Sequence, residues 1–140
     1  MLRCAIRRKE VADTPEERVR QKLVAFLERG CGVPRRAISV EVDLKALGLD
    51  VTGRADLVVW KSGSGDVRRP WLLAECKAPG ELVEAEVEGQ VARYLQGMSP
   101  DWVVAADDES LFVWSLASEN GKKTLVSSTD LPKWSSGTNF

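Results

Sequence analysis

Residues 71–77 (WLLAECK) constrain the fold most, because four consecutive apolar residues run directly into a Glu-x-Lys triplet. A strand with one face in water alternates apolar and polar residues, whereas a strand covered on both faces is apolar throughout. We therefore expect residues 71–77 to form a central strand. Such a strand needs strands beside it on both edges and helices packed on both faces.

Other segments of the sequence supply those neighbours. A helix is predicted over residues 15–29, since Thr14 is a typical N-cap and Pro15 a typical first helical residue. A second helix is predicted over residues 82–98, where apolar side chains recur at helical spacing. The predicted strands span residues 37–44, 54–60, 71–77, 102–106 and 111–115, with a short edge strand at 124–127. This order predicts an α/β protein with a central mixed sheet flanked by helices.

The length of 140 residues fits one domain with a core of its own. We expect that domain to span residues 14–127. Residues 1–13 are expected to form a mobile or edge segment, and residues 61–70 a loop. Residues 128–140 are expected to be a polar C-terminal tail.

The composition excludes several kinds of chemistry. The chain contains no histidine, which excludes histidine general bases, Ser–His and Cys–His nucleophile pairs, and His-ligated zinc. The single Gly-Lys pair, at residues 121–122, lacks the upstream glycine and the adjacent Ser or Thr of a phosphate-binding loop. Any hydrolysis by this chain must therefore rest on carboxylates, lysine and a hard metal ion.

Cysteine usage and hydropathy indicate the compartment. The three cysteines are scattered and form no CxxC pair, so neither a disulfide framework nor a thiolate zinc site is indicated. No apolar run approaches the roughly 20 residues that cross a bilayer. We expect a reducing, cytoplasmic location and no membrane partner.

The charge is small in total but unevenly distributed. The net charge is −1; residues 1–70 contain 15 Lys/Arg and 10 Asp/Glu, whereas residues 71–140 contain 5 and 11. A face that binds nucleic acid would have to come from the first half of the chain. Ordinary solvated charges are the alternative explanation of the same distribution.

Three charged residues are predicted to converge on one site. Asp56 begins one predicted strand, and Glu75 and Lys77 end the next on a common face, because side chains alternate along a strand. A hairpin would bring Asp56 beside them. Two carboxylates suit Mg²⁺, which takes oxygen ligands and keeps several waters, and an ammonium group can stabilise charge on a reacting phosphate. An ordinary Asp/Glu–Lys ion-pair network is the alternative explanation.

Further residues on the two predicted helices frame this site. Glu16 is expected on the apolar side of the first helix and Glu17 off it, so we expect Glu16 to face the metal; a role as a helix-dipole partner is the alternative. Gln90 and Tyr94 are four residues apart and share a face of the second helix. Both are candidate contacts to a substrate or to the metal site. Solvent exposure of Gln90 and core packing of Tyr94 are the alternatives.

Four segments in this order resemble the PD-(D/E)XK nuclease superfamily. The closest resemblance is to small proteins similar to the N-terminal nuclease domain of type I restriction enzyme R subunits. The segments are residues 15–21 (PEERVRQ), 54–59 (RADLVV) and 75–79 (ECKAP), and the pair Gln90 and Tyr94, within a resemblance that runs from about residue 15 to residue 114. One departure is Ala55, where the superfamily signature has proline. The resemblance implies an αβββαβ restriction-endonuclease-like core.

The same resemblance implies roles for the site residues. By position, Asp56 and Glu75 would bind Mg²⁺, for which Mn²⁺ substitutes, and Glu16 would support the metal site. Lys77 would be catalytic, and Gln90 and Tyr94 would act beside it.

The expected function is that of a DNA endonuclease in restriction or DNA processing, in which a metal-activated water attacks a phosphodiester. One competing expectation is a non-catalytic binding or scaffold module that keeps the nuclease fold in a DNA-processing complex. Another is a different metal hydrolase on a similar site. DNA is the expected partner. A second copy of the chain, or restriction and motor subunits, are the further partners expected, because this sequence contains no motif of an NTPase motor.

Overall fold

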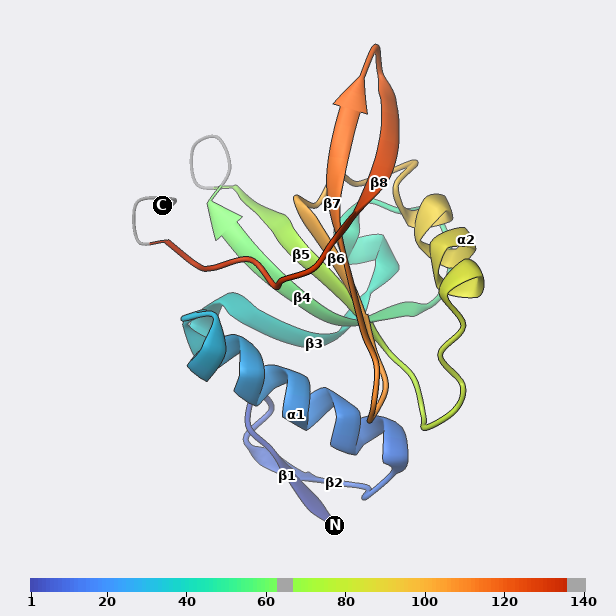
Figure 1. The fold of residues 1–140 in the computed structure, drawn as a ribbon. Coiled ribbons are helices and arrows are strands. Elements are labelled where there is room, and N and C mark those ends of the chain that lie inside the picture. Colours follow the sequence, from blue (N-terminus) through green and yellow to red (C-terminus); the bar gives the residue numbers. More distant parts are fainter. Residues whose placement is uncertain (63–66, 136–140) are drawn as a thin grey trace.

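The computed structural model describes residues 1–62 and 67–135. Its centre is a six-stranded mixed sheet with the strand order β3-β4-β5-β6-β7-β8 (Figure 1). Only β5 and β6 pair in parallel, and every other neighbouring pair in this sheet is antiparallel. The strands are β3 (Ile38–Asp43), β4 (Arg54–Ser62), β5 (Arg68–Cys76), β6 (Trp102–Ala106), β7 (Leu111–Glu119) and β8 (Lys122–Ser128). As expected, β5 lies inside the sheet, and its residues 71–76 are all buried.

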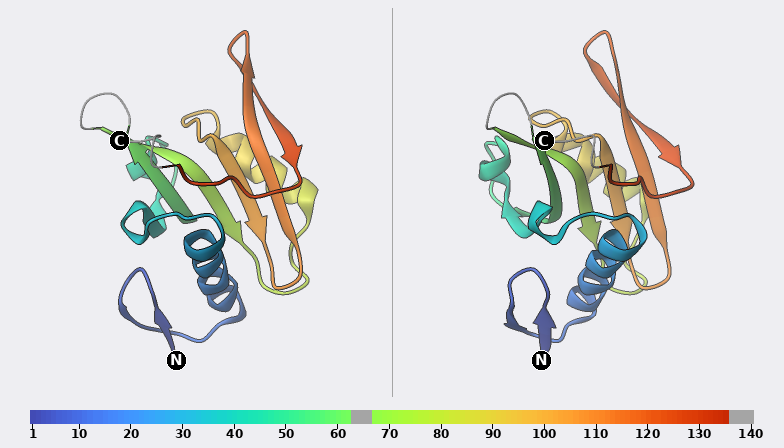
Figure 2. Two further views of the ribbon diagram at one scale, coloured as in Figure 1. Left: turned by 60° about the vertical axis from the view of Figure 1, so that its left-hand side comes forward. Right: turned by 90° about the vertical axis from the view of Figure 1, so that its left-hand side faces the viewer.

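The two α-helices cover opposite faces of this sheet (Figures 1 and 2). Helix α1 (Pro15–Gly30) begins at the expected cap, where Thr14 Oγ1 accepts a hydrogen bond of 3.1 Å from the Glu17 N–H. Its apolar side packs on alternate residues of β4 and β5, including Leu57 and Leu72. Helix α2 (Glu84–Tyr94) is shorter than the predicted span and packs on the other face. The protein is therefore mixed α/β, with the sheet between the helices.

Two of the connecting segments contain short 3₁₀ turns. A 3₁₀ turn η1 (Arg35–Ala37) leads into β3, and a second, η2 (Leu44–Leu47), follows it. The order along the chain from α1 is helix, β3, β4, β5, helix, β6. None of the described helices is long and apolar enough to traverse a membrane.

The N-terminal segment is not the mobile or edge element that we expected. It forms a separate two-stranded sheet of β1 (Leu2–Cys4) and β2 (Lys9–Val11). Cys4 is fully buried, and the Ala5 N–H donates a hydrogen bond of 3.1 Å to Gln21 Oε1 on α1. The hairpin is therefore anchored on the first helix.

The expectation of a polar C-terminal tail is wrong for residues 131–134. Trp134 packs edge-on against Trp71 of β5, with ring centroids 5.2 Å apart, and its backbone N–H donates to the Cys31 carbonyl over 2.8 Å. Leu131 also packs against the core on the α1 side. Two apolar residues in a short polar segment gave too weak a periodic signal to predict this. Residues 136–140 of the expected tail, and 63–66 of the expected 61–70 loop, lie outside the described residues.

Candidate functional site

Asp56 and Glu75 meet at one end of the β4–β5 pair. The register pairs Leu57 with Ala74, so Asp56 and Glu75 are the next residues on the two strands. Asp56 Oδ2 accepts a hydrogen bond of 2.7 Å from the backbone N–H of Cys76. The hairpin thus brings together the two carboxylates that sequence reasoning assigned to one site.

Glu75 is a buried carboxyl group whose oxygens are not both paired. It is only 3 % exposed, and its Oε1 has no hydrogen-bond partner among the described residues. Burial, followed by the neighbouring charge of Asp56, raises the pKa of Glu75 to about 9, while Lys77 acts in the opposite direction. Near neutral pH this carboxyl therefore holds a proton in the absence of a further cation. Ionisable groups with strongly shifted pKa values are concentrated in functional sites.

Lys77 begins a short polar chain that reaches α2. Its Nζ lies 3.5 Å from Gln90 Oε1, and Gln90 Nε2 donates a hydrogen bond of 2.9 Å to the Tyr94 hydroxyl. Tyr94 is 7 % exposed, so it both fills the core and directs its hydroxyl toward Gln90. Burial raises the pKa of Tyr94, with the charge of Glu75 as the next cause. The structure therefore brings Lys77, Gln90 and Tyr94 to the same side of the carboxylate pair.

For the two acids at the start of α1, the expectation was that Glu16 faces the metal site and Glu17 lies off the apolar side of the helix. Glu16 is the one that approaches Asp56: burial raises its pKa, and the charge of Asp56 is the next cause. Its side chain nevertheless remains 46 % exposed. Glu17, placed off the apolar stripe by its sequence position, is buried, and it turns instead toward Arg7, Arg20 and Gln21. The burial of Glu17 was missed because its partners come from the unexpected hairpin as well as from the helix.

Arg20 is the site residue that sequence reasoning missed. Its side chain is 5 % exposed, and its Nη2 lies 3.3 Å from Asp56 Oδ1. The same guanidinium lies 2.7 Å from Glu17 and 3.7 Å from Glu41. Arg20 lies three residues after Glu17 and four residues after Glu16, which are the spacings of ion pairs along a helix. Nothing local in the sequence indicated that Arg20 reaches the strand residue Asp56.

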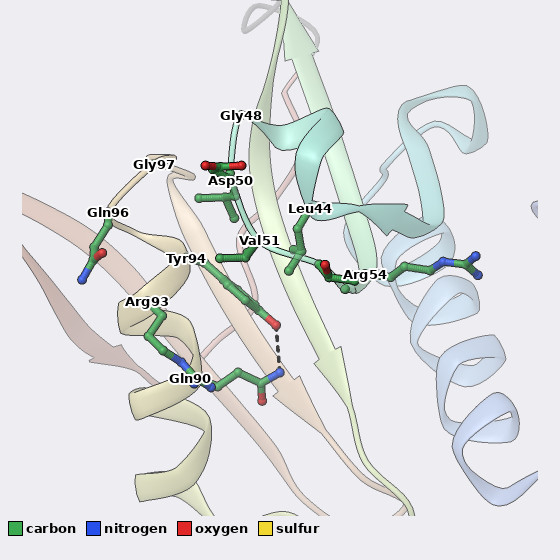
Figure 3. A pocket seen from close by; sticks show the side chains of 13 residues that line it. Leu44, Gly48, Asp50, Val51, Arg54, Gln90, Arg93, Tyr94, Gln96 and Gly97 are labelled. Atoms are coloured by element: carbon green, nitrogen blue, oxygen red, sulfur yellow. Dashed lines mark hydrogen bonds between the residues drawn. The ribbon is translucent and has the colours of Figure 1, made fainter.

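A cleft of about 820 Å³ opens beside the site, between α2 and the segment that joins η2 to β4 (Figure 3). Gln90 and Tyr94 form part of one wall, and Leu44 and Val51 lie across from them. Arg54 borders the cleft but extends away from α2, and it pairs with Glu41 at 3.6 Å. The cleft therefore leads from solvent to Gln90, which contacts Lys77.

The donor atoms at this site fit a hard divalent cation. Asp56 and Glu75 offer only oxygen ligands, and the unpartnered Glu75 Oε1 is a buried acceptor that a cation would satisfy. Within residues 1–62 and 67–135, no group of three or more acidic or Cys side chains is arranged to hold a metal ion. Since Mg²⁺ keeps several waters, one or two carboxylates suffice for it. Cys76 does not compete as a ligand, because burial raises the pKa of its thiol and it packs into the core on the α1 side.

One comparison with known proteins finds a related family. The family model described as Type I restriction enzyme R protein N terminus matches residues 15–132. The comparisons with curated proteins and with solved structures find no match. The matched range begins with α1 and includes every residue of the site described above, whereas the β1–β2 hairpin lies outside it.

Proposed function

The chain belongs to the family of type I restriction enzyme R protein N termini, and we propose that it is a Mg²⁺-dependent DNA endonuclease domain of the PD-(D/E)XK type. Membership of this family relates the chain to restriction and DNA processing. The assignment of catalysis rests on the site. Two adjacent carboxylates, one of them buried with an unpartnered oxygen, stand beside Lys77.

The carboxylate pair is the observation that carries the proposal. A buried carboxyl is costly unless it gains a partner, and a purely structural ion pair would bring that partner with it. Arg20 contacts Asp56, yet Glu75 keeps a free Oε1 among the described residues. The unpartnered oxygen of Glu75 supports a site that binds a cation from solution.

The proposed reaction adds water to phosphorus and breaks one P–O ester bond, which leaves a phosphate end and a hydroxyl end. Mg²⁺ held by Asp56 and Glu75 would neutralise charge on the phosphate and lower the pKa of water. Lys77 would stabilise the negative charge that develops on the phosphate oxygens. Gln90 would hold the Lys77 ammonium in place, since its own orientation is fixed by Tyr94.

DNA is the proposed substrate, and a multi-subunit restriction complex the proposed setting. The family name refers to the R protein of a type I restriction enzyme. Motor or specificity functions would come from other segments or subunits. A second copy of this domain would be needed to cut both strands at once.

We expect Asp56→Ala and Lys77→Ala to reduce Mg²⁺-dependent cleavage of supercoiled plasmid by at least about 100-fold, the usual loss when a group that stabilises transition-state charge is removed. Gel assays of nicked and linear plasmid measure the rate. Circular dichroism and thermal unfolding show that each variant is folded.

Glu119→Ala and Lys122→Ala are matched controls, because both residues are exposed and lie at the far end of the β7–β8 hairpin. They should cut as well as the wild type. Cleavage that survives in both site variants contradicts the proposal. A wild-type protein that binds Mn²⁺ and DNA without cutting would favour the scaffold function instead.

A further inference from the structure

Both oxygens of Asp56 are already engaged in the structure. Oδ2 accepts from the backbone N–H of Cys76 over 2.7 Å, and Oδ1 lies 3.3 Å from Arg20 Nη2. A cation that binds Asp56 must therefore share an oxygen with one of these donors. The Cys76 N–H is fixed in a buried strand, so the longer contact, between Oδ1 and Arg20, marks the oxygen that a cation would share.

Arg20 is itself held in place by contacts behind it. Its Nη1 lies 2.7 Å from Glu17 Oε1, and Gln21 Nε2 donates to Glu17 Oε2 over 2.8 Å. Arg7, at the turn of the β1–β2 hairpin, also pairs with Glu17. The guanidinium is thus directed at Asp56 by contacts that begin in a hairpin outside the family match.

We propose, on the basis of the proposed function, that Arg20 is a positioning residue that orients Asp56 and competes with the metal ion for its Oδ1. In the metal-free protein the guanidinium neutralises Asp56 and fixes its rotamer. When a divalent cation binds, the two positive charges repel each other at short range in a poorly solvated site. Arg20 therefore weakens metal binding while it keeps Asp56 in the orientation that cleavage needs.

This role predicts opposite changes in two measurements. Removal of the Arg20 charge should lower the Mn²⁺ dissociation constant by about tenfold, because the repulsion is lost. The same change should slow plasmid cleavage at saturating Mn²⁺ by about tenfold or more, because Asp56 is then held by the Cys76 N–H alone. A role in folding alone would weaken metal binding and activity together.

The experiment compares wild type with Arg20→Gln and Arg20→Lys by calorimetric titration with Mn²⁺ and by plasmid cleavage. Arg20→Lys keeps the charge, so its Mn²⁺ affinity should stay within about twofold of the wild type. Arg18→Gln is the matched control on the same helix, because Arg18 is an exposed partner of Asp13. It should change neither measurement.

Loss of Arg20 alone removes one of the two cations that pair with the buried Glu17 and leaves it Arg7 and Gln21, which weakens the fold. The double variant Glu17→Gln, Arg20→Gln removes both charges of this ion pair, so it can be tested for Mn²⁺ binding if the single variant does not fold. Unchanged or weaker Mn²⁺ binding in the folded variants that carry Arg20→Gln overturns the role of Arg20 and leaves the proposed function standing. Mn²⁺ binding without cleavage by the wild type overturns the proposed function alone, since the titration still decides the role of Arg20. If the wild type binds no Mn²⁺, both proposals fail.

Discussion

Glu75 shows how a single side chain can be unfavourable for folding and useful for function. Burial and the charge of Asp56 raise its pKa to about 9 from an ordinary value of 4.5. A group with a raised folded-state pKa contributes stability below its unfolded pKa and loses that contribution as the pH rises toward the folded pKa. The metal-free protein should therefore lose stability between about pH 4.5 and pH 9 on account of this residue.

We expect Glu75→Gln to be more stable than the metal-free wild type at pH 8, by roughly 4–5 kcal/mol, because the amide cannot ionise. At pH 5 the two proteins should be nearly equal in stability. Urea unfolding in the presence of a chelator, at pH 5, 6.5 and 8, measures the difference. A difference that stays constant across this range would show that Glu75 does not titrate as described.

For single residues, the alternation of side chains along a strand was enough to predict that Asp56, Glu75 and Lys77 lie together. Alternation depends only on neighbouring residues, and the β4–β5 hairpin sets the register that places the two strands side by side. Arg20 could not be assigned to the site in the same way. Its contact with Asp56 spans 36 residues of sequence and depends on how α1 packs against the sheet.

The end of α2 illustrates how one element is fitted to its neighbour. After Tyr94 the chain turns at Gly97, where an added Cβ would lie 2.4 Å from Leu49 Cδ2 and 3.5 Å from the Gly48 carbonyl oxygen. Leu49 is buried and also lines the cleft, so its side chain would have to shift to make room for a Cβ at Gly97. The absence of a side chain at Gly97 therefore allows the segment before β4 to close over the end of α2.

We expect Gly97→Ala to destabilise the protein by about 1–2 kcal/mol, as overpacking does in other cores. Gly89→Ala is the matched comparison, since Gly89 lies inside α2 and an added Cβ there meets no atom within 4 Å. That change should instead stabilise the protein by about 0.5–1 kcal/mol through helix propensity. Thermal or urea unfolding measures both. Equal effects of the two substitutions would contradict the described packing.

Elements with long apolar periodicity were predictable, and short ones were less so. The helices were predictable from apolar spacing and cap residues, and the inner strands from their apolar runs. The β7–β8 hairpin is longer than predicted. Its Asn120-Gly121 turn has the positive φ angles, 52° and 78°, that tight hairpins favour. This Asn-Gly pair is the sequence signal that indicates the longer hairpin. The three-residue strands of the N-terminal hairpin carry too few residues for any periodic signal.

The site is a property of the whole molecule, because four elements from both faces of the sheet contribute to it. Helix α1 supplies Arg20, β4 and β5 supply the carboxylates, and α2 supplies Gln90 and Tyr94. The order of elements along the chain was predictable from periodicity, whereas the packing that brings α1 to Asp56 was not. The family match covers all four elements.

The central claim is that the Asp56–Glu75 pair is a cation site. Crystals of the protein soaked in Mn²⁺ at pH 8 and measured for anomalous scattering test it most directly, and the elevated pKa of Glu75 makes an alkaline soak appropriate. We predict one Mn²⁺ ion bound to carboxylate oxygens of both residues at about 2.1 Å, with water completing its octahedron. A soaked crystal with no anomalous peak at this pair, or with Mn²⁺ bound only elsewhere, would contradict the account.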